Sequence, residues 1–202
     1  LSASLTPPTV TGPTCTAPAS PLRVERSASN CAVASFNPPT VTGPALTTLS
    51  MVAERAAVQR HTLYAHFPDE RSLFMACSGL SLERDPLPDA VAWRSIADHQ
   101  ERLRTGLAAL YAWYERNADL AGCVLRDAEY HPLTREIADL RLGPSMAAYA
   151  DVLGIKLNSR QRAMLQLALS FFTWRTLVQD SGLKSVAAAR TMARAIDGAS
   201  ES

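Results

Sequence analysis

The chain has 202 residues, and its 20 Lys and Arg against 19 Asp and Glu leave a formal net charge of only +1. A chain of that length can bury a sizeable core without stabilising disulfide bonds. The near-zero net charge excludes a strongly basic surface for binding nucleic acid and an acidic tail. The four cysteines (Cys15, Cys31, Cys77 and Cys123) are far apart and form no C-x-x-C, so neither a zinc cage nor a thioredoxin-like pair is expected.

Membrane and export signals are missing from the pattern. No stretch of about 18 consecutive apolar residues occurs. The N-terminus also lacks the basic start and apolar core of a signal peptide. We therefore expect a soluble, cytoplasmic protein with no membrane partner.

The N-terminal quarter has an unusual composition. Residues 1–49 contain eight of the thirteen prolines, are rich in Ser, Thr and Ala, and carry only three charged side chains. Such a segment buries too little apolar surface to offset its ordering entropy. The heptapeptide PPTVTGP occurs at 7–13 and again at 38–44, which leaves a polyproline docking motif as the less favoured alternative. We predict a disordered or atypical tail over 1–43, and whether residues 1–49 are a genuine part of the protein stays open.

Helical spacing begins after the tail. Pro44 suits a first helical position, and the pattern predicts one helix over 45–57. A tight turn and a short second helix follow, in which Leu63 and Phe67 are four residues apart and share one face. That face can pack against Val52, Ala53 and Ala56. Acidic residues directly after Pro68 predict the start of the next helix.

The rest of the chain also shows apolar residues at helical spacing. Apolar repeats predict further helices at 88–117, 120–129, 133–153, 160–179 and 184–196. We expect the third of these to be interrupted or kinked at Gly143 and Pro144. The helix at 160–179 is apolar over so wide an arc that it is either enclosed or shared with another subunit. No convincing strand follows residue 49, so the predicted fold is all-α.

The outward face of the short second helix carries side chains suited to DNA. Amide and guanidinium groups can reach base edges in the major groove, while hydroxyl groups can donate to phosphates. We expect DNA contacts from Gln59, Arg60, His61, Thr62, Tyr64 and Arg71. A solvated polar face is the alternative for these residues. Residues 50–74 carry three basic and three acidic side chains. DNA binding would therefore depend on the geometry of a few contacts and on a dimer that supplies two copies of the segment.

The order T-L-Y-A-H-F at 62–67, preceded by V-A-E-R-A-A-V at 52–58 and followed by Leu73 and Phe74, resembles the TetR family of bacterial transcriptional regulators. The resemblance implies a helix-turn-helix DNA-binding module, which we assign to 44–82. It also implies a helical-bundle effector and dimerisation domain, which we assign to 83–202. The family's pattern has a first helix where this chain is Pro-rich. It usually has a glycine at the position of Ala57, and often a lysine at that of Glu70.

Further expectations concern partners. We expect a homodimer joined through 160–179 and 184–196, reading palindromic double-stranded DNA with half-sites roughly 34–36 Å apart. The resemblance also implies a small hydrophobic effector, and aromatic side chains could line its pocket. The candidates are Tyr111, Tyr114, Tyr149, Phe171 and Trp174. The sequence specifies neither operator nor effector, nor whether repression or activation results.

The residues also bear on two other functions, an enzyme and a ligand-binding protein. No nucleotide-binding or hydrolase motif occurs, so we expect no enzymatic activity, no cofactor and no metal site. The cluster of Arg126, Asp127, Glu129 and His131 could act as an acid-base site, but a solvated ion-pair network is favoured. The main alternative to a ligand-responsive repressor is a helical dimeric ligand-binding protein whose DNA-binding module has decayed.

Overall fold

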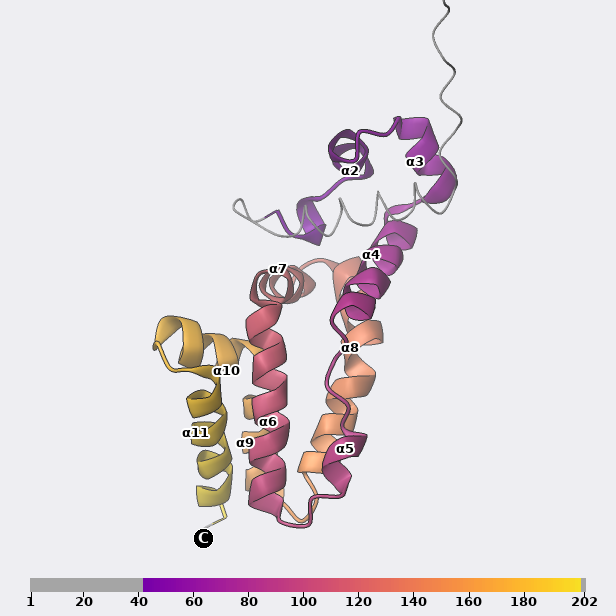
Figure 1. Ribbon diagram of the computed structural model, residues 1–202. Coiled ribbons are helices and arrows are strands. Elements are labelled where there is room, and N and C mark those ends of the chain that lie inside the picture. Colours follow the sequence, from indigo (N-terminus) through magenta and orange to yellow (C-terminus); the bar gives the residue numbers. More distant parts are fainter. Residues whose placement is uncertain (1–41, 201–202) are drawn as a thin grey trace, which may run out of the picture.

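The computed structural model describes residues 42–200, and within this range it contains helices and no strand. Figure 1 shows a small group of short helices at one end of α4 and a larger bundle beyond it. This confirms the predicted all-α fold. The tail predicted over 1–43 lies almost entirely outside the described residues. None of the described helices is both long and apolar enough to cross a bilayer.

The N-terminal group consists of a 3-10 turn and three helices. They are η1 (Pro44–Leu46), α2 (Leu49–Arg55), α3 (Arg60–His66) and α4 (Glu70–Arg84). The single helix predicted over 45–57 is wrong, because the chain leaves helical geometry after Leu46 and starts again at Leu49. The Thr48 side chain accepts a hydrogen bond from the Met51 N–H and so caps the new start.

The predicted packing within this group is confirmed for Val52 and Ala53, whereas Ala56 is only partly buried and lies outside the apolar cluster. Leu63 of α3 and Phe67, which directly follows α3, are buried, at 0% and 4% exposed, and they share one apolar cluster with Val52 and Ala53 of α2. Leu73, Phe74 and Cys77 of α4 belong to the same cluster. The short helices α2 and α3 are therefore held in place by α4, since helices of seven residues are marginal on their own.

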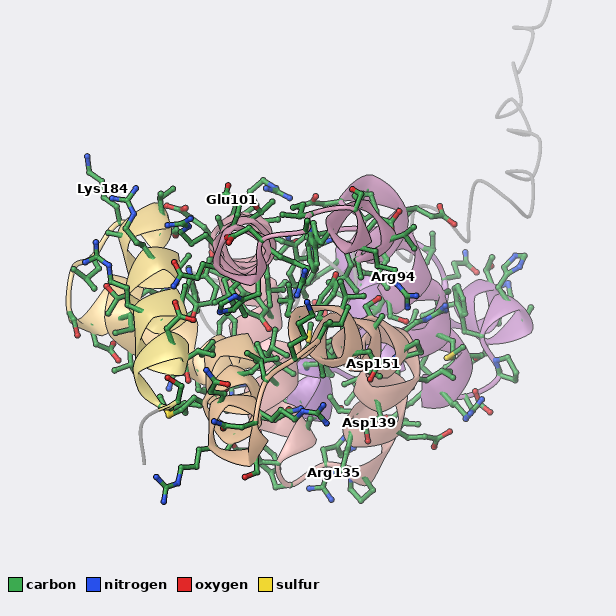
Figure 2. All side chains as sticks on the ribbon, turned by 90° about the horizontal axis from the view of Figure 1, so that it is seen from below. Arg94, Glu101, Arg135, Asp139, Asp151 and Lys184 are labelled. Atoms are coloured by element: carbon green, nitrogen blue, oxygen red, sulfur yellow. The ribbon has the colours of Figure 1, made fainter. Side chains whose placement is uncertain are left out.

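The larger bundle contains the remaining elements. They are α5 (Val91–Arg94), α6 (His99–Arg116), α7 (Ala118–Ala128), α8 (Pro132–Leu153), α9 (Ser159–Leu169), α10 (Phe171–Arg175), the π-turn η2 (Thr176–Asp180) and α11 (Ser185–Gly198). Helix α6 lies beside α11 and also contacts α8 and α9 (Figure 1). Charged side chains such as Lys184 point away from the bundle (Figure 2).

Two of the predicted long helices are divided. The helix expected over 88–117 is α5 followed by α6, because Asp98 leaves helical geometry and caps α6 through the Glu101 N–H at 2.7 Å. The helix expected over 160–179 breaks at Ser170, whose hydroxyl caps α10. In contrast, α8 continues through Gly143 and Pro144 instead of being interrupted there.

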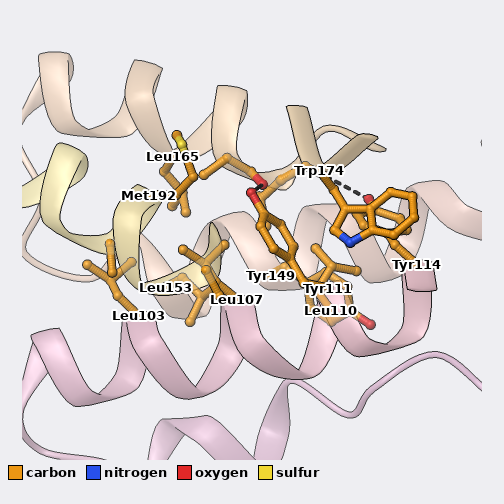
Figure 3. Close-up of a cluster of buried hydrophobic side chains, with 14 of the residues drawn as sticks. Leu103, Leu107, Leu110, Tyr111, Tyr114, Tyr149, Leu153, Leu165, Trp174 and Met192 are labelled. Atoms are coloured by element: carbon orange, nitrogen blue, oxygen red, sulfur yellow. Dashed lines mark hydrogen bonds between the residues drawn. The ribbon is translucent and has the colours of Figure 1, made fainter. Parts of the chain in front are cut away.

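The bundle core is built around one face of α6. Leu103, Leu107 and Leu110 are 0% exposed and lie against side chains of α8, α9 and α11 (Figure 3). Gly106 lets Leu153 of α8 pack against the backbone of α6, since a Cβ there would lie 2.6 Å from a methyl carbon of Leu153. The absence of a side chain at Gly106 thus allows α8 to pack close to α6.

Candidate DNA-binding surface and effector cavity

The outer face of α3 is open to solvent. Gln59, Arg60 and His61 are exposed, Tyr64 is 45% exposed, and Thr62 is half-buried. Gln59 occupies the cap position of α3, yet its side chain makes no capping bond. The face opposite the buried Leu63 and Phe67 therefore presents the polar groups predicted to contact DNA.

The turn before α3 uses a left-handed backbone. Ala57 adopts φ 52°, a conformation that glycine reaches without the steric cost an alanine bears. This is the position at which the resemblance led us to expect a glycine. The turn is closed by the Val58 N–H, which donates to the Ala53 carbonyl at 3.0 Å. The geometry that glycine would favour is thus kept by packing and hydrogen bonding.

Arg71, the sixth DNA-contact candidate, lies near the start of α4. Its guanidinium pairs with the Glu136 carboxylate of α8, which raises the pKa of Arg71. Both side chains are about half exposed, at 52% and 54%. Just before it, the Ser72 N–H donates to the Asp69 side chain at 2.7 Å, which caps α4 and lowers the pKa of Asp69. Arg71 is therefore shared between the module's surface and the bundle.

The five aromatic side chains expected at an effector pocket are buried in the bundle core. The tyrosine hydroxyls donate to backbone carbonyls: Tyr111 to Ala168 at 3.0 Å, Tyr114 to Leu169 at 2.7 Å and Tyr149 to Pro88 at 2.6 Å. Burial raises the pKa of Tyr149 to about 12. The rings of Phe171 and Trp174 pack on Tyr114, with centroids 5.4 and 6.0 Å from its own. Figure 3 shows Trp174 beside Tyr114.

A cavity lies elsewhere, between α4, α7 and α8. Its volume is about 100 Å³, several times what a single water needs. The wall is mainly apolar and includes Phe74, Leu82, Val124, Leu125 and Leu142, whereas none of the five aromatic candidates lines it. Sequence reasoning missed this site because its wall comes from separate elements and has no periodic signature of its own.

The polar side chains in the cavity wall already have partners. Arg141 donates to the Met75 carbonyl at 2.8 Å and to the Ser78 hydroxyl at 3.1 Å. Ser81 donates to the Cys77 carbonyl, and Asn117 donates to the Asp85 carboxylate at 2.7 Å. A polar ligand would have to break these bonds, so the cavity suits an apolar molecule.

The cluster considered as an acid-base site differs from expectation. Asp127 is 0% exposed and accepts hydrogen bonds from Arg126 and Tyr130. The prediction of a solvated ion-pair network is therefore wrong for Asp127, which is buried. His131 instead contacts the Thr134 hydroxyl at 2.7 Å and caps α8. Within residues 42–200, no group of three or more His, Cys, Asp or Glu side chains is placed to hold a metal ion.

A short helix with an exposed polar face, held by an apolar cluster beside a helical bundle, defines the class of helix-turn-helix DNA-binding proteins. Residues 41–77 match the family model described as bacterial regulatory proteins, tetR family. The match covers the helix-turn-helix segment and supports a DNA-binding transcriptional regulator that is similar to members of the TetR family.

Solved structures share the fold across both parts of the chain. A Clostridium perfringens protein proposed to regulate fatty acid metabolism is 16% identical, with a TM-score of 0.60 over 85% of this chain and 97% of its own. A proposed TetR-family regulator from Mesorhizobium loti is 14% identical, with a TM-score of 0.59 over 89% and 96%. The TetR-family regulator PfmR from Thermus thermophilus is 17% identical, with a TM-score of 0.57 over 86% and 96%. No curated protein matches the sequence at a significant level.

Proposed function

We propose that this regulator is a ligand-responsive repressor that reads DNA through α3. In this proposal Gln59, Arg60 and His61 reach base edges in the major groove, while Thr62, Tyr64 and Arg71 contact the backbone. The observation that carries it is the exposed polar face of α3 above buried Leu63 and Phe67, inside the segment that matches the family. Residues 44–82 form the DNA-binding unit and 83–202 the effector and dimerisation unit.

The proposed homodimer pairs the C-terminal helices of two copies. Leu167 of α9 and Val186 of α11 are 51% and 62% exposed, so both side chains are available for such an interface. Two copies of α9–α11 would place two α3 helices on half-sites roughly 34–36 Å apart, so the operator would be palindromic. Chromosomal DNA as the target requires a cytoplasmic location.

We assign the effector site to the cavity between α4, α7 and α8, and a small hydrophobic ligand to that site. Helix α4 supports the proposal because Phe74 and Cys77 belong to the DNA-binding module's apolar cluster and also line the cavity. A ligand that separates α4 from α8 would therefore shift α3, provided that it binds one arrangement more tightly than the other. In this proposal the five aromatic core residues support the cavity from behind and do not touch the ligand.

The test is DNA binding with substitutions on α3. We expect Arg60→Ala to weaken binding to a duplex from the region flanking the coding sequence by about tenfold or more, and Tyr64→Phe to weaken it several-fold. Arg94→Ala is the matched control, because Arg94 is an exposed arginine on α5 (Figure 2). Fluorescence anisotropy at low and moderate salt measures the affinities. Equally poor binding by wild type and both α3 variants would favour the decayed-module alternative.

A further inference from the structure

A buried carboxylate connects the bundle to the chain just before α2. Asp127 of α7 is 0% exposed; its Oδ1 accepts from Arg126 and from the Tyr130 hydroxyl, each at 2.7 Å. Its Oδ2 accepts from the Ala45 backbone N–H at 3.0 Å. Burial opposes the charge, but the hydrogen bonds from Tyr130, Ala45 and Arg126 outweigh it and keep the pKa of Asp127 below its ordinary value. The buried, charged Asp127 carboxylate is thus stabilised in part by the Ala45 backbone N–H.

The fit between this carboxylate and turn η1 requires a glycine. A Cβ on Gly43 would lie 2.1 Å from Oδ2 of Asp127 and 2.8 Å from a guanidinium nitrogen of Arg126. The backbone of Gly43 has φ −73°, which any residue can adopt, so the requirement is for space and not for conformational freedom. Turn η1 is therefore seated directly on the Arg126–Asp127 pair.

Turn η1 is in turn joined to α2 by successive hydrogen bonds. The Thr47 hydroxyl donates to the Gly43 carbonyl at 3.0 Å, and the Thr47 N–H donates to the Pro44 carbonyl at 3.1 Å. The next residue, Thr48, caps α2. No residue between the turn and α2 lacks such a restraint, so displacement of the turn is passed to α2 and, through the shared apolar cluster, to α3.

The same turn also forms part of the cavity wall. Pro44 is buried and lines the cavity together with Ala121, Val124 and Leu125 of α7. In Figure 1 the segment preceding α2 lies beside α7, away from α4. A molecule in the cavity would therefore meet η1 on one side and α4 on another.

We propose that Asp127 and turn η1 form a latch between the DNA-binding module and α7, and that filling the cavity displaces Pro44 and opens it. The second half of this proposal rests on the effector role proposed for the cavity. With the latch closed, the module is attached to the bundle at two places, through α4 and through η1. With it open, only α4 remains, and α2 and α3 lose the orientation they hold in this structure.

The first measurement is hydrogen exchange at the Ala45 amide, followed by NMR on the full chain. Gly43→Ala places a methyl group against the Asp127 carboxylate. Asp127→Asn leaves one oxygen acceptor, which cannot accept from Ala45 on one side and from Arg126 and Tyr130 on the other at the same time. We expect each to speed exchange at Ala45 by about tenfold, relative to the core amide of Leu107. Gly198→Ala, which meets open space, and Asp119→Asn, exposed on α7, are the matched controls. Unchanged exchange at Ala45, or an equal rise at Leu107, would overturn the latch.

The second measurement uses a substitution in place of the unidentified ligand. Val124→Phe adds a ring to the cavity wall, and we expect it to speed exchange at Ala45 and to weaken DNA binding by about tenfold. In a Gly43→Ala background, where the latch is already open, it should add little to either effect. Weaker DNA binding with unchanged Ala45 exchange would show that the cavity acts through α4, which overturns the latch and leaves the proposed function intact. If wild type binds no DNA, the proposed function fails, while exchange at Ala45 still decides the latch.

Discussion

At the scale of single residues, several side chains of the DNA-binding module serve local geometry and the proposed function at once. Ala57 closes the turn that sets the angle between α2 and α3, and Arg71 belongs both to the proposed DNA surface and to an ion pair with Glu136. A change at either position alters the module without touching the exposed face of α3.

Ala57 bears the cost of a left-handed backbone, and glycine would not. We expect Ala57→Gly to raise the free energy of unfolding by up to about 1 kcal/mol, after allowance for the greater freedom of glycine in the unfolded chain. Urea unfolding followed by circular dichroism measures the change. Ala65→Gly, at an exposed position within α3, should instead lower stability by about 0.5–1 kcal/mol. A loss of stability in both variants would contradict the assignment of strain to Ala57.

In the proposed complex with DNA, Glu136 would compete with a DNA phosphate for Arg71. We expect Glu136→Gln to raise DNA affinity about threefold, because Arg71 would then be free to contact a phosphate. The slope of log affinity against log salt concentration should become more negative by about one, which corresponds to one more phosphate contact. A salt series measured by anisotropy tests both effects. Asp139→Asn, on the same helix and also exposed, is the control (Figure 2). An unchanged salt slope would place Arg71 outside the DNA contact.

At the scale of elements, capping side chains decide where the helices of the bundle begin. Apolar residues recur at helical spacing on both sides of residues 97–102, and the chain breaks before His99 because Asp98 caps the next helix. Ser170 does the same between α9 and α10. Such breaks let the chain change direction while each segment keeps its apolar face toward the core.

The cap on α6 should have a measurable effect, because α6 contributes the largest part of the bundle core. We expect Asp98→Ala to lower the free energy of unfolding by about 1 kcal/mol. The comparison is Asp151→Ala, an exposed aspartate inside α8 (Figure 2), where no loss is expected since alanine is the better helix former. Thermal and urea unfolding of the two variants, side by side, test this. Equal stabilities would mean that packing alone starts α6.

At the scale of the whole molecule, the proposed regulation needs two copies. Each chain offers one short helix to DNA, and residues 50–74 carry no excess of positive charge. One module alone would therefore bind weakly, whereas a dimer couples two such contacts at a fixed spacing. The exposed aliphatic side chains on α9 and α11 are where we place that coupling.

Leu167→Arg tests the dimer directly. We expect the variant to be monomeric in sedimentation equilibrium at micromolar concentration and to lose DNA affinity by about tenfold or more, since a charged side chain cannot be buried unpaired at the interface. Leu140→Arg is the control, because Leu140 is equally exposed (52%) on α8, outside the proposed interface. A Leu167→Arg protein that remains dimeric would move the interface to another face.

The sequence alone determined the all-helical class and the packing register of the helix-turn-helix. These properties depend on spacing between near neighbours, such as Leu63 and Phe67, and on local signals such as Asp69 after Pro68. The contacts of Asp127 and Arg71, and the cavity between α4, α7 and α8, were decided only by the tertiary structure. Ala45 and Asp127 are 82 residues apart, and Arg71 and Glu136 are 65 apart. Periodicity carries no information about which distant polar groups will meet, because that depends on how whole helices pack.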